Sequence, residues 1–185
     1  MKKRGFLLIF LLVLTISSFL LKTAVFAQEA TISGEIYTPR LLPDSPFYFL
    51  KSWKEKIELF LARSDKDKAQ KEAEIATRRI AEAKQLIKKK KFQLAEKTML
   101  KHREHLNKAL DKLDRAQEQG EDVEAVVKIV VQATSQHLNV LSQVYEKVPQ
   151  RAKEAIEKAI EVSSHGQERA IEAISQEKKD LFQSC

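Results

Sequence analysis

Apolar residues recur every three or four positions along most of the chain after residue 43, which is the spacing that places them on one face of an α-helix. Three long seams of this kind follow one another: Ala69, Ala73, Ala76, Ile80, Ala83 and Ile87; then Phe92, Ala95, Met99, His102, Leu106, Ala109, Leu113 and Ala116; then Val123, Val127, Val130, Thr134, His137, Leu141, Val144 and Val148. Steps of four and three residues alternate, which is typical of helices that pack at a shallow angle. The pattern predicts an all-α protein, an antiparallel helical bundle of five to six helices.

Polar caps, glycine and proline mark the ends of these helices. Ser64 caps the helix of the first seam, Gly120 ends the helix of the second, and Pro149 begins a fifth helix. Gly166 ends the fifth helix, and a weaker sixth helix is expected over residues 167–182. Because the connections are short, consecutive helices should be antiparallel neighbours, and those on either side of Gly120 should form a hairpin.

The first helix has a different composition, because it concentrates the aromatic residues. It is predicted to start at Asp44-Ser45-Pro46, where a polar cap precedes a proline at the first helical position. Its apolar residues at helical spacing are Leu50, Trp53, Ile57 and Phe60, next to Phe47, Tyr48 and Phe49. We interpret this helix as the hydrophobic anchor of the core. A groove for an aromatic ligand is the alternative.

The N-terminus carries the three parts of a secretory signal. Three cations, Lys2 to Arg4, precede an apolar run from Gly5 to Leu21. The segment then ends in Ala24-Val25-Phe26-Ala27, with small residues at the −3 and −1 positions of a cleavage after Ala27. We predict a signal peptide over residues 1–27, a linker over residues 28–42 and a helical bundle domain over residues 43–185. If the signal is not cleaved, it is a membrane anchor, and in both cases the domain is extracytoplasmic: secreted, periplasmic or at the cell surface.

Removal of this signal changes the charge and leaves one cysteine to consider. The net charge falls from +7 to +3, because residues 1–27 carry four cations and no acid, so nucleic acid is not an expected partner. The single cysteine, Cys185, excludes an internal disulfide framework and leaves intermolecular pairing open.

Two segments carry a resemblance to a known family. The run Leu41–Lys51 contains "LPDSP" followed by aromatic residues and "LK", and residues 76–83 read "ATRRIAEA". These motifs, with residues 91–95 and 148–159, resemble the domain-of-unknown-function family 5667 over roughly Leu41 to Ile174. The resemblance implies an all-helical extracytoplasmic domain with no established activity, and it supplies no catalytic residues.

Two histidines are the first candidate site. His102 and His137 lie on apolar seams at similar distances in sequence from Gly120, so in a hairpin their imidazoles should meet, with His105 near Thr134. The pair is a polar layer that sets helix register, a pH-responsive layer, or part of a transition-metal site. A metal site also needs an acid or a thiolate, and Glu104 points off the seam, so we predict no metal and no cofactor.

Charged clusters are the second group of candidates. A basic end of the second helix is formed by Lys84, Lys88, Lys89, Lys90 and Lys91. It is either a solubilising turn at the negative end of the helix dipole or a binding site for anionic headgroups or wall polymers. Arg78, Arg79 and Glu82 are either an anion site or an ion pair that ties their helix to a neighbour, and we favour the ion pair.

No nucleophile, carboxylate pair or glycine-rich loop has the spacing of a known catalytic motif, so we predict that the chain is not an enzyme. The expected function is that of an exported cell-envelope structural or protein-interaction module. Its expected partner is another envelope protein or a second copy, with membrane contact only through an uncleaved signal. The alternative is an extracytoplasmic stress- or ligand-sensing protein that acts through the histidine layer or through Lys88–Lys91.

Overall fold

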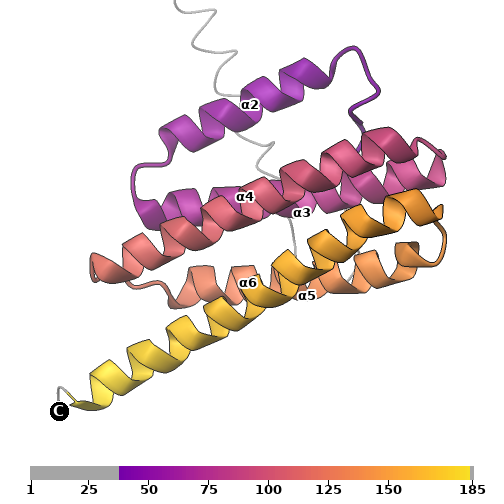
Figure 1. The fold of residues 1–185 in the computed structure, drawn as a ribbon. Coiled ribbons are helices and arrows are strands. Elements are labelled where there is room, and N and C mark those ends of the chain that lie inside the picture. The colour runs from indigo at the N-terminus through magenta and orange to yellow at the C-terminus, as the bar shows by residue number, and fades with distance from the viewer. Residues whose placement is uncertain (1–37, 184–185) are drawn as a thin grey trace, which may run out of the picture. The chain divides into compact units, whose positions relative to one another are not determined.

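A computed structural model describes residues 38–183, and the described part of the chain consists of helices without strands. The helices are α2 (Tyr48–Leu61), α3 (Asp65–Lys88), α4 (Phe92–Glu118), α5 (Glu124–Tyr145) and α6 (Gln150–Gln183) (Figure 1). The all-α bundle predicted from the seams is therefore confirmed. The signal at residues 1–27, most of the linker and Cys185 lie outside the described residues.

Four of the helices surround one core. Helix α3 packs against α4 and α5, and α6 packs against the same two helices, while α2 lies on the outside and contacts α3 (Figure 1). Helices α4 and α5 are consecutive in sequence but lie diagonally across the bundle, so the expected hairpin around Gly120 is wrong. The alanine residues in the seams of α3 and α4 allow these two helices to pack closely, and the chain then crosses the end of the bundle before α5 begins.

The core has two apolar halves. One half combines residues of four segments, 69–76, 106–116, 123–130 and 170–173. The other combines residues 80–87, 95–99, 140–148 and 152–159. Between them lies a layer of buried polar side chains: His102, Thr134, His137 and Ser163, with the half-buried Thr77 beside them. The seams predicted from the sequence are buried, except for the partly buried Phe92, and the polar layer lies where the histidines interrupt them.

Gly166 does not end a helix. Helix α6 is continuous from Gln150 to Gln183, so the predicted break between a fifth and a sixth helix is wrong. The glycine instead lies where α6 approaches its neighbours, since a Cβ built there would be 3.2 Å from Leu110 Cδ1 and 3.6 Å from Thr134 Cγ2. Close helix packing explains why a glycine is present at this position. Glycine has a low helix propensity, and packing against the neighbouring helices stabilises α6 at this point.

Replacing Gly166 by valine should therefore overpack the core. We expect Gly166→Val to lower the free energy of unfolding by about 2 kcal/mol, because the two added methyl groups extend beyond a Cβ that is already in tight contact. Chemical denaturation measures this loss. The exposed position Glu161 of the same helix provides the control, since Glu161→Val adds the same side chain in solvent. Equal losses in both variants would contradict close packing at Gly166.

Helix α2 is oriented opposite to the prediction. It begins at Tyr48 instead of Pro46, and its buried residues are Tyr48 and Glu55. The expected anchor residues form an exposed surface, which we call the outward face of α2: Phe49, Leu50, Trp53, Ile57, Phe60 and Leu61, between 42 and 86% exposed. Periodicity identifies residues that share a face of a helix, but the polar partners on α3 decide which face of α2 is buried. Among residues 38–183, no helix is long and apolar enough to cross a membrane.

Candidate functional site

Helix α2 is held on α3 by a buried polar cluster, which we call the α2–α3 network: Tyr48, Lys51, Glu55, Arg79 and Glu82. The carboxylate of Glu82 is at its centre and is fully buried. Its Oε2 accepts a hydrogen bond from the Tyr48 hydroxyl at 2.8 Å, and its Oε1 accepts one from Arg79 Nη1 at 2.9 Å. The Lys51 ammonium also bonds to Glu82, and Arg79 Nη2 donates to Glu55. Three α2 side chains therefore converge on one acid and one base of α3.

The charges of this network balance, with two acids and two bases in a buried interface. Burial lowers the pKa of Arg79, but the negative charges of Glu82 and Glu55 outweigh this effect and raise it overall, so the guanidinium stays charged. Burial and the Glu82 charge raise the pKa of the Tyr48 phenol, which therefore keeps its proton and remains a donor. Since each charged group has a partner of opposite sign, the network is suited to fixing α2 in one orientation.

The two segments with the family resemblance meet in this network. The first segment supplies Tyr48 and Lys51, and "ATRRIAEA" supplies Arg79 and Glu82. The ion pair predicted between Arg79 and Glu82 therefore forms within α3, and the same two residues bind α2. Arg78 extends the interface at its edge, where Nη1 is 3.2 Å from Glu58 Oε2. Spacing in sequence had indicated Arg79 and Glu82, whereas Tyr48 and Glu55 were missed, although they lie seven residues apart on one side of α2.

The basic turn lies beside the N-terminal end of α2. Asp44 accepts a hydrogen bond from Lys91 Nζ at 2.7 Å and lies 3.5 Å from Lys89 Nζ. The bond from Lys91 lowers the pKa of Asp44 most strongly, and Lys89 lowers it further. Lys88 and Lys90 are exposed, and Lys84 is half-buried. One acid therefore offsets part of the positive charge of this turn.

The structure brings His102 and His137 together at the centre of the bundle. Their ring centroids are 4.6 Å apart in an edge-to-face arrangement, and both side chains are fully buried. They meet across the diagonal between α4 and α5, not along a hairpin. Helix α3 contributes to the same layer, since the carbonyl of Ala76 is 3.3 Å from His102 Nδ1 and Thr77 Oγ1 is 2.9 Å from His137 Nε2.

Hydrogen bonds connect this layer to α3. His137 Nε2 lies 2.9 Å from Thr77 Oγ1, which is also 3.0 Å from the Ala73 carbonyl, whereas His137 Nδ1 is buried without a hydrogen-bond partner. His102 Nδ1 donates to the Ala76 carbonyl, which accepts only. Desolvation lowers the pKa of His102 to about 4 and lowers that of His137 well below its usual value, so both rings are neutral near pH 7.

His105 does not join this layer. It was expected near Thr134, but its Nδ1 lies 2.5 Å from Glu72 Oε2 on α3, because α4 packs beside α3 and not beside α5. Glu104 is exposed and bonds to Lys108 at 2.6 Å. Within residues 38–183, no three His, Cys, Asp or Glu side chains are grouped as metal ligands.

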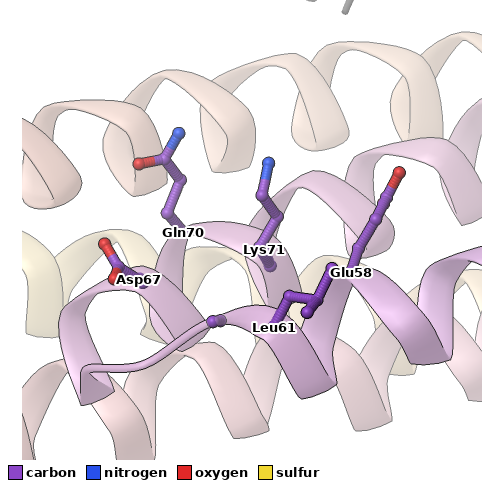
Figure 2. A pocket seen from close by; sticks show the side chains of 6 residues that line it. Glu58, Leu61, Asp67, Gln70 and Lys71 are labelled. Carbon is purple, nitrogen blue, oxygen red and sulfur yellow. The ribbon is translucent and has the colours of Figure 1, made fainter. Parts of the chain in front are cut away.

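One open hollow lies where the end of α2 meets the start of α3 (Figure 2). It has a volume of about 330 Å³ and is lined by Glu58, Leu61, Ala62, Asp67, Gln70 and Lys71. Gln70 and Lys71 both bond to Glu74, at 3.0 Å each. The lining mixes both charges with two apolar residues, Leu61 and Ala62, and it offers no set of convergent donors or acceptors that would define a ligand.

The fold and the network define a class of protein: a helical bundle with an additional helix fixed to its outside by buried ion pairs. The chain belongs to the family described as Domain of unknown function (DUF5667), whose model matches residues 40–151. This match spans the basic turn, the histidine pair and the whole α2–α3 network. Comparison with curated proteins and with solved structures found no match.

Proposed function

We propose that this protein is an exported, non-catalytic module of the cell envelope that binds another envelope component through the outward face of α2. The α2–α3 network and the histidine layer support a non-catalytic role, because their polar side chains are buried and form hydrogen bonds or ion pairs between helices. Export is supported by the sequence of residues 1–27, with its cationic start, apolar run and small residues before Gln28.

The orientation of α2 is the observation that carries the proposal. An ordinary surface helix buries its apolar face and exposes its polar face, but α2 buries Tyr48 and Glu55 and exposes its apolar side. The aromatic side chains of Phe47, Phe49, Trp53 and Phe60 are between 61 and 86% exposed. At 150–250 Å² for each aromatic residue, they alone expose several hundred Å², which is as large as the largest apolar patch of a typical monomer.

The α2–α3 network explains how this exposure persists. If α2 rotated to bury its apolar face, Arg79 and Glu82 would lose their α2 partners while remaining buried, at a cost of several kcal/mol. The network therefore maintains an apolar surface that folding alone would hide. An apolar surface that the fold keeps exposed to solvent in this way is typical of a binding site.

Fractionation of cells that express the full chain tests this proposal. We expect the protein in the envelope fraction, with a mature N-terminus at Gln28 by mass spectrometry. The variant Trp53→Ser/Phe60→Ser should shift it to the soluble exported fraction, with envelope association reduced on the order of tenfold or more. Leu100→Ser/Ile171→Ser, which changes two side chains that are 51 and 50% exposed on α4 and α6, is the matched control. Equal retention of both variants, or a chain that stays in the cytoplasm, would overturn the proposal.

Acid sensing is a second candidate, favoured by the unpartnered Nδ1 of His137. Protonation of the His137 ring would place a charge between the two apolar halves of the core, with Nδ1 unpartnered, and would loosen all four helices. A sensor of this kind would change its envelope association between pH 7.5 and pH 5, and substitution of His137 would abolish that change. An association that is constant over this range would exclude the second candidate.

A further inference from the structure

We propose that the outward face of α2 binds the anionic surface of a phospholipid bilayer. This inference rests on the proposed function and specifies its partner. The helix would lie in the plane of the interface, with its apolar side chains at the boundary between headgroups and acyl chains and with α3 on the side away from the lipid.

The charges around the outward face are the first argument. At 3.6 residues per turn, Lys54 and Lys56 lie on the two edges of this face. Of the acids of the helix, Glu55 is buried in the α2–α3 network, and Glu58 is half-buried beside Arg78 and lies 3.6 Å from Lys54 Nζ. The Lys54 side chain is nevertheless 69% exposed, so its ammonium remains accessible at the edge of the face. The outward side of α2 therefore combines an apolar strip with cationic edges, and this charge is complementary to an anionic surface.

The kinds of apolar side chain are the second argument. Phe49, Trp53 and Phe60 dominate the strip, and tryptophan and phenylalanine are typical of helices that lie in a membrane interface. The basic turn adds positive charge near the start of α2, because Asp44 pairs with Lys91 and lies 3.5 Å from Lys89. Lys88 and Lys90 are exposed in the same turn and form no ion pair within the described part of the chain.

The same charges disfavour two other occupants. A second copy packed through its own α2 would bring Lys54 and Lys56 of both molecules to the edges of one interface, where like charges repel. The segment Met1–Ala27 has four cations and no acid, so it also lacks the complementary charge. An anionic bilayer supplies both an apolar phase and the opposite charge.

Vesicle flotation with the chain that lacks Met1–Ala27 tests this inference, since the compact unit Gly34–Cys185 remains whole in it. The probes are phosphatidylglycerol–phosphatidylcholine vesicles at equal amounts and vesicles of phosphatidylcholine alone. We expect binding to the anionic vesicles, weakened by salt, together with a shift of tryptophan emission to shorter wavelength. Trp53 is the single tryptophan of the chain, so this signal reports directly on the outward face.

Two pairs of variants separate the apolar and the charge contributions. Trp53→Ser/Phe60→Ser and Lys54→Gln/Lys56→Gln should each reduce binding to anionic vesicles on the order of tenfold or more. The controls Leu100→Ser/Ile171→Ser and Lys128→Gln/Lys158→Gln change exposed apolar residues and exposed lysines on other helices, and they should bind like the parent chain. Unchanged circular dichroism of each variant shows that it is folded.

The outcomes distinguish this inference from the proposed function. Equal binding to both vesicle types would show that the lysines do not select an anionic surface, and this result would overturn the inference. If no vesicle binds but Trp53→Ser/Phe60→Ser still releases the protein from envelopes, the lipid inference fails and the proposed function stands with a protein partner. A dimer in solution that these two substitutions dissociate would assign the face to a second copy.

Discussion

Replacing Glu82 by alanine is expected to lower the free energy of unfolding by about 3–5 kcal/mol, the largest effect of any single substitution considered. The carboxylate is fully buried and bonds to Tyr48, Lys51 and Arg79, so its removal leaves two cations near each other with Glu55 as the remaining acid. Breaking a buried ion pair from one side costs this much because the partner charge stays desolvated. Urea denaturation followed by circular dichroism measures the loss.

Two further variants test whether burial causes the effect. Glu104→Ala removes the same side chain from a helix position that is 59% exposed, where it pairs with Lys108, and should change stability by less than about 0.5 kcal/mol. Tyr48→Phe removes one buried hydroxyl and should cost about 1 kcal/mol. Amide exchange in residues 48–61 should accelerate in Glu82→Ala, since α2 loses its main support. If Glu82→Ala lowered the free energy of unfolding as little as Glu104→Ala does, the α2–α3 network would not be what holds α2 in place.

Lowering the pH from 7.5 to 5.0 is expected to destabilise the fold, with His102 alone contributing about 2 kcal/mol. Its pKa is about 4 in the folded state and about 6.5 when unfolded. Between these values the unfolded chain binds a proton that the folded chain does not, so stability is full above pH 6.5 and is lost as the pH falls toward 4. His137, whose pKa is also lowered, adds to the loss in the same direction.

Thermal melts of the wild type and of His102→Leu/His137→Leu test this origin of the pH dependence. The double variant should lose most of the difference between pH 7.5 and pH 5.0, whereas His165→Gln, at an exposed position of α6, should keep it. Added zinc or nickel should leave both melts unchanged, because both nitrogens of His102 are engaged by Ala76 and Ser163. A wild-type melt that does not respond to pH would show that the layer accepts protons while folded.

Much of the fold could be predicted from the sequence because helical periodicity is a local property. The seams of α3, α4 and α5 are buried as expected, with Ala69, Leu106 and Val127 among the fully buried residues. The meeting of His102 and His137 also followed from their positions relative to Gly120, although the predicted hairpin was wrong. A short connection between two helices places residues equidistant from it at the same height along the bundle axis, whether the helices are neighbours or lie diagonally. The height of the two histidines was therefore predictable, but which helices pack against each other was not.

The remaining features depend on contacts between distant segments. The face that α2 buries is decided by Arg79 and Glu82 on another helix, and a pattern within α2 cannot show this. Gly166 has two physical readings, a helix end or a close approach, and only its distance from Leu110 distinguishes them. The outward face was therefore not predicted as an exposed surface, because its residues had been interpreted as core residues, with a ligand groove as the alternative.

Thiol labelling in whole cells tests the central claim most directly, namely that an exported protein uses the outward face of α2. In a Cys185→Ser background, Phe60→Cys and Leu100→Cys place one thiol at positions that are 86 and 51% exposed. With a reagent that does not cross the cytoplasmic membrane, we expect Leu100→Cys to react at once and Phe60→Cys to stay protected until detergent dissolves the envelope. Equal labelling of both positions before detergent, or labelling of neither until the cells are lysed, would contradict the account.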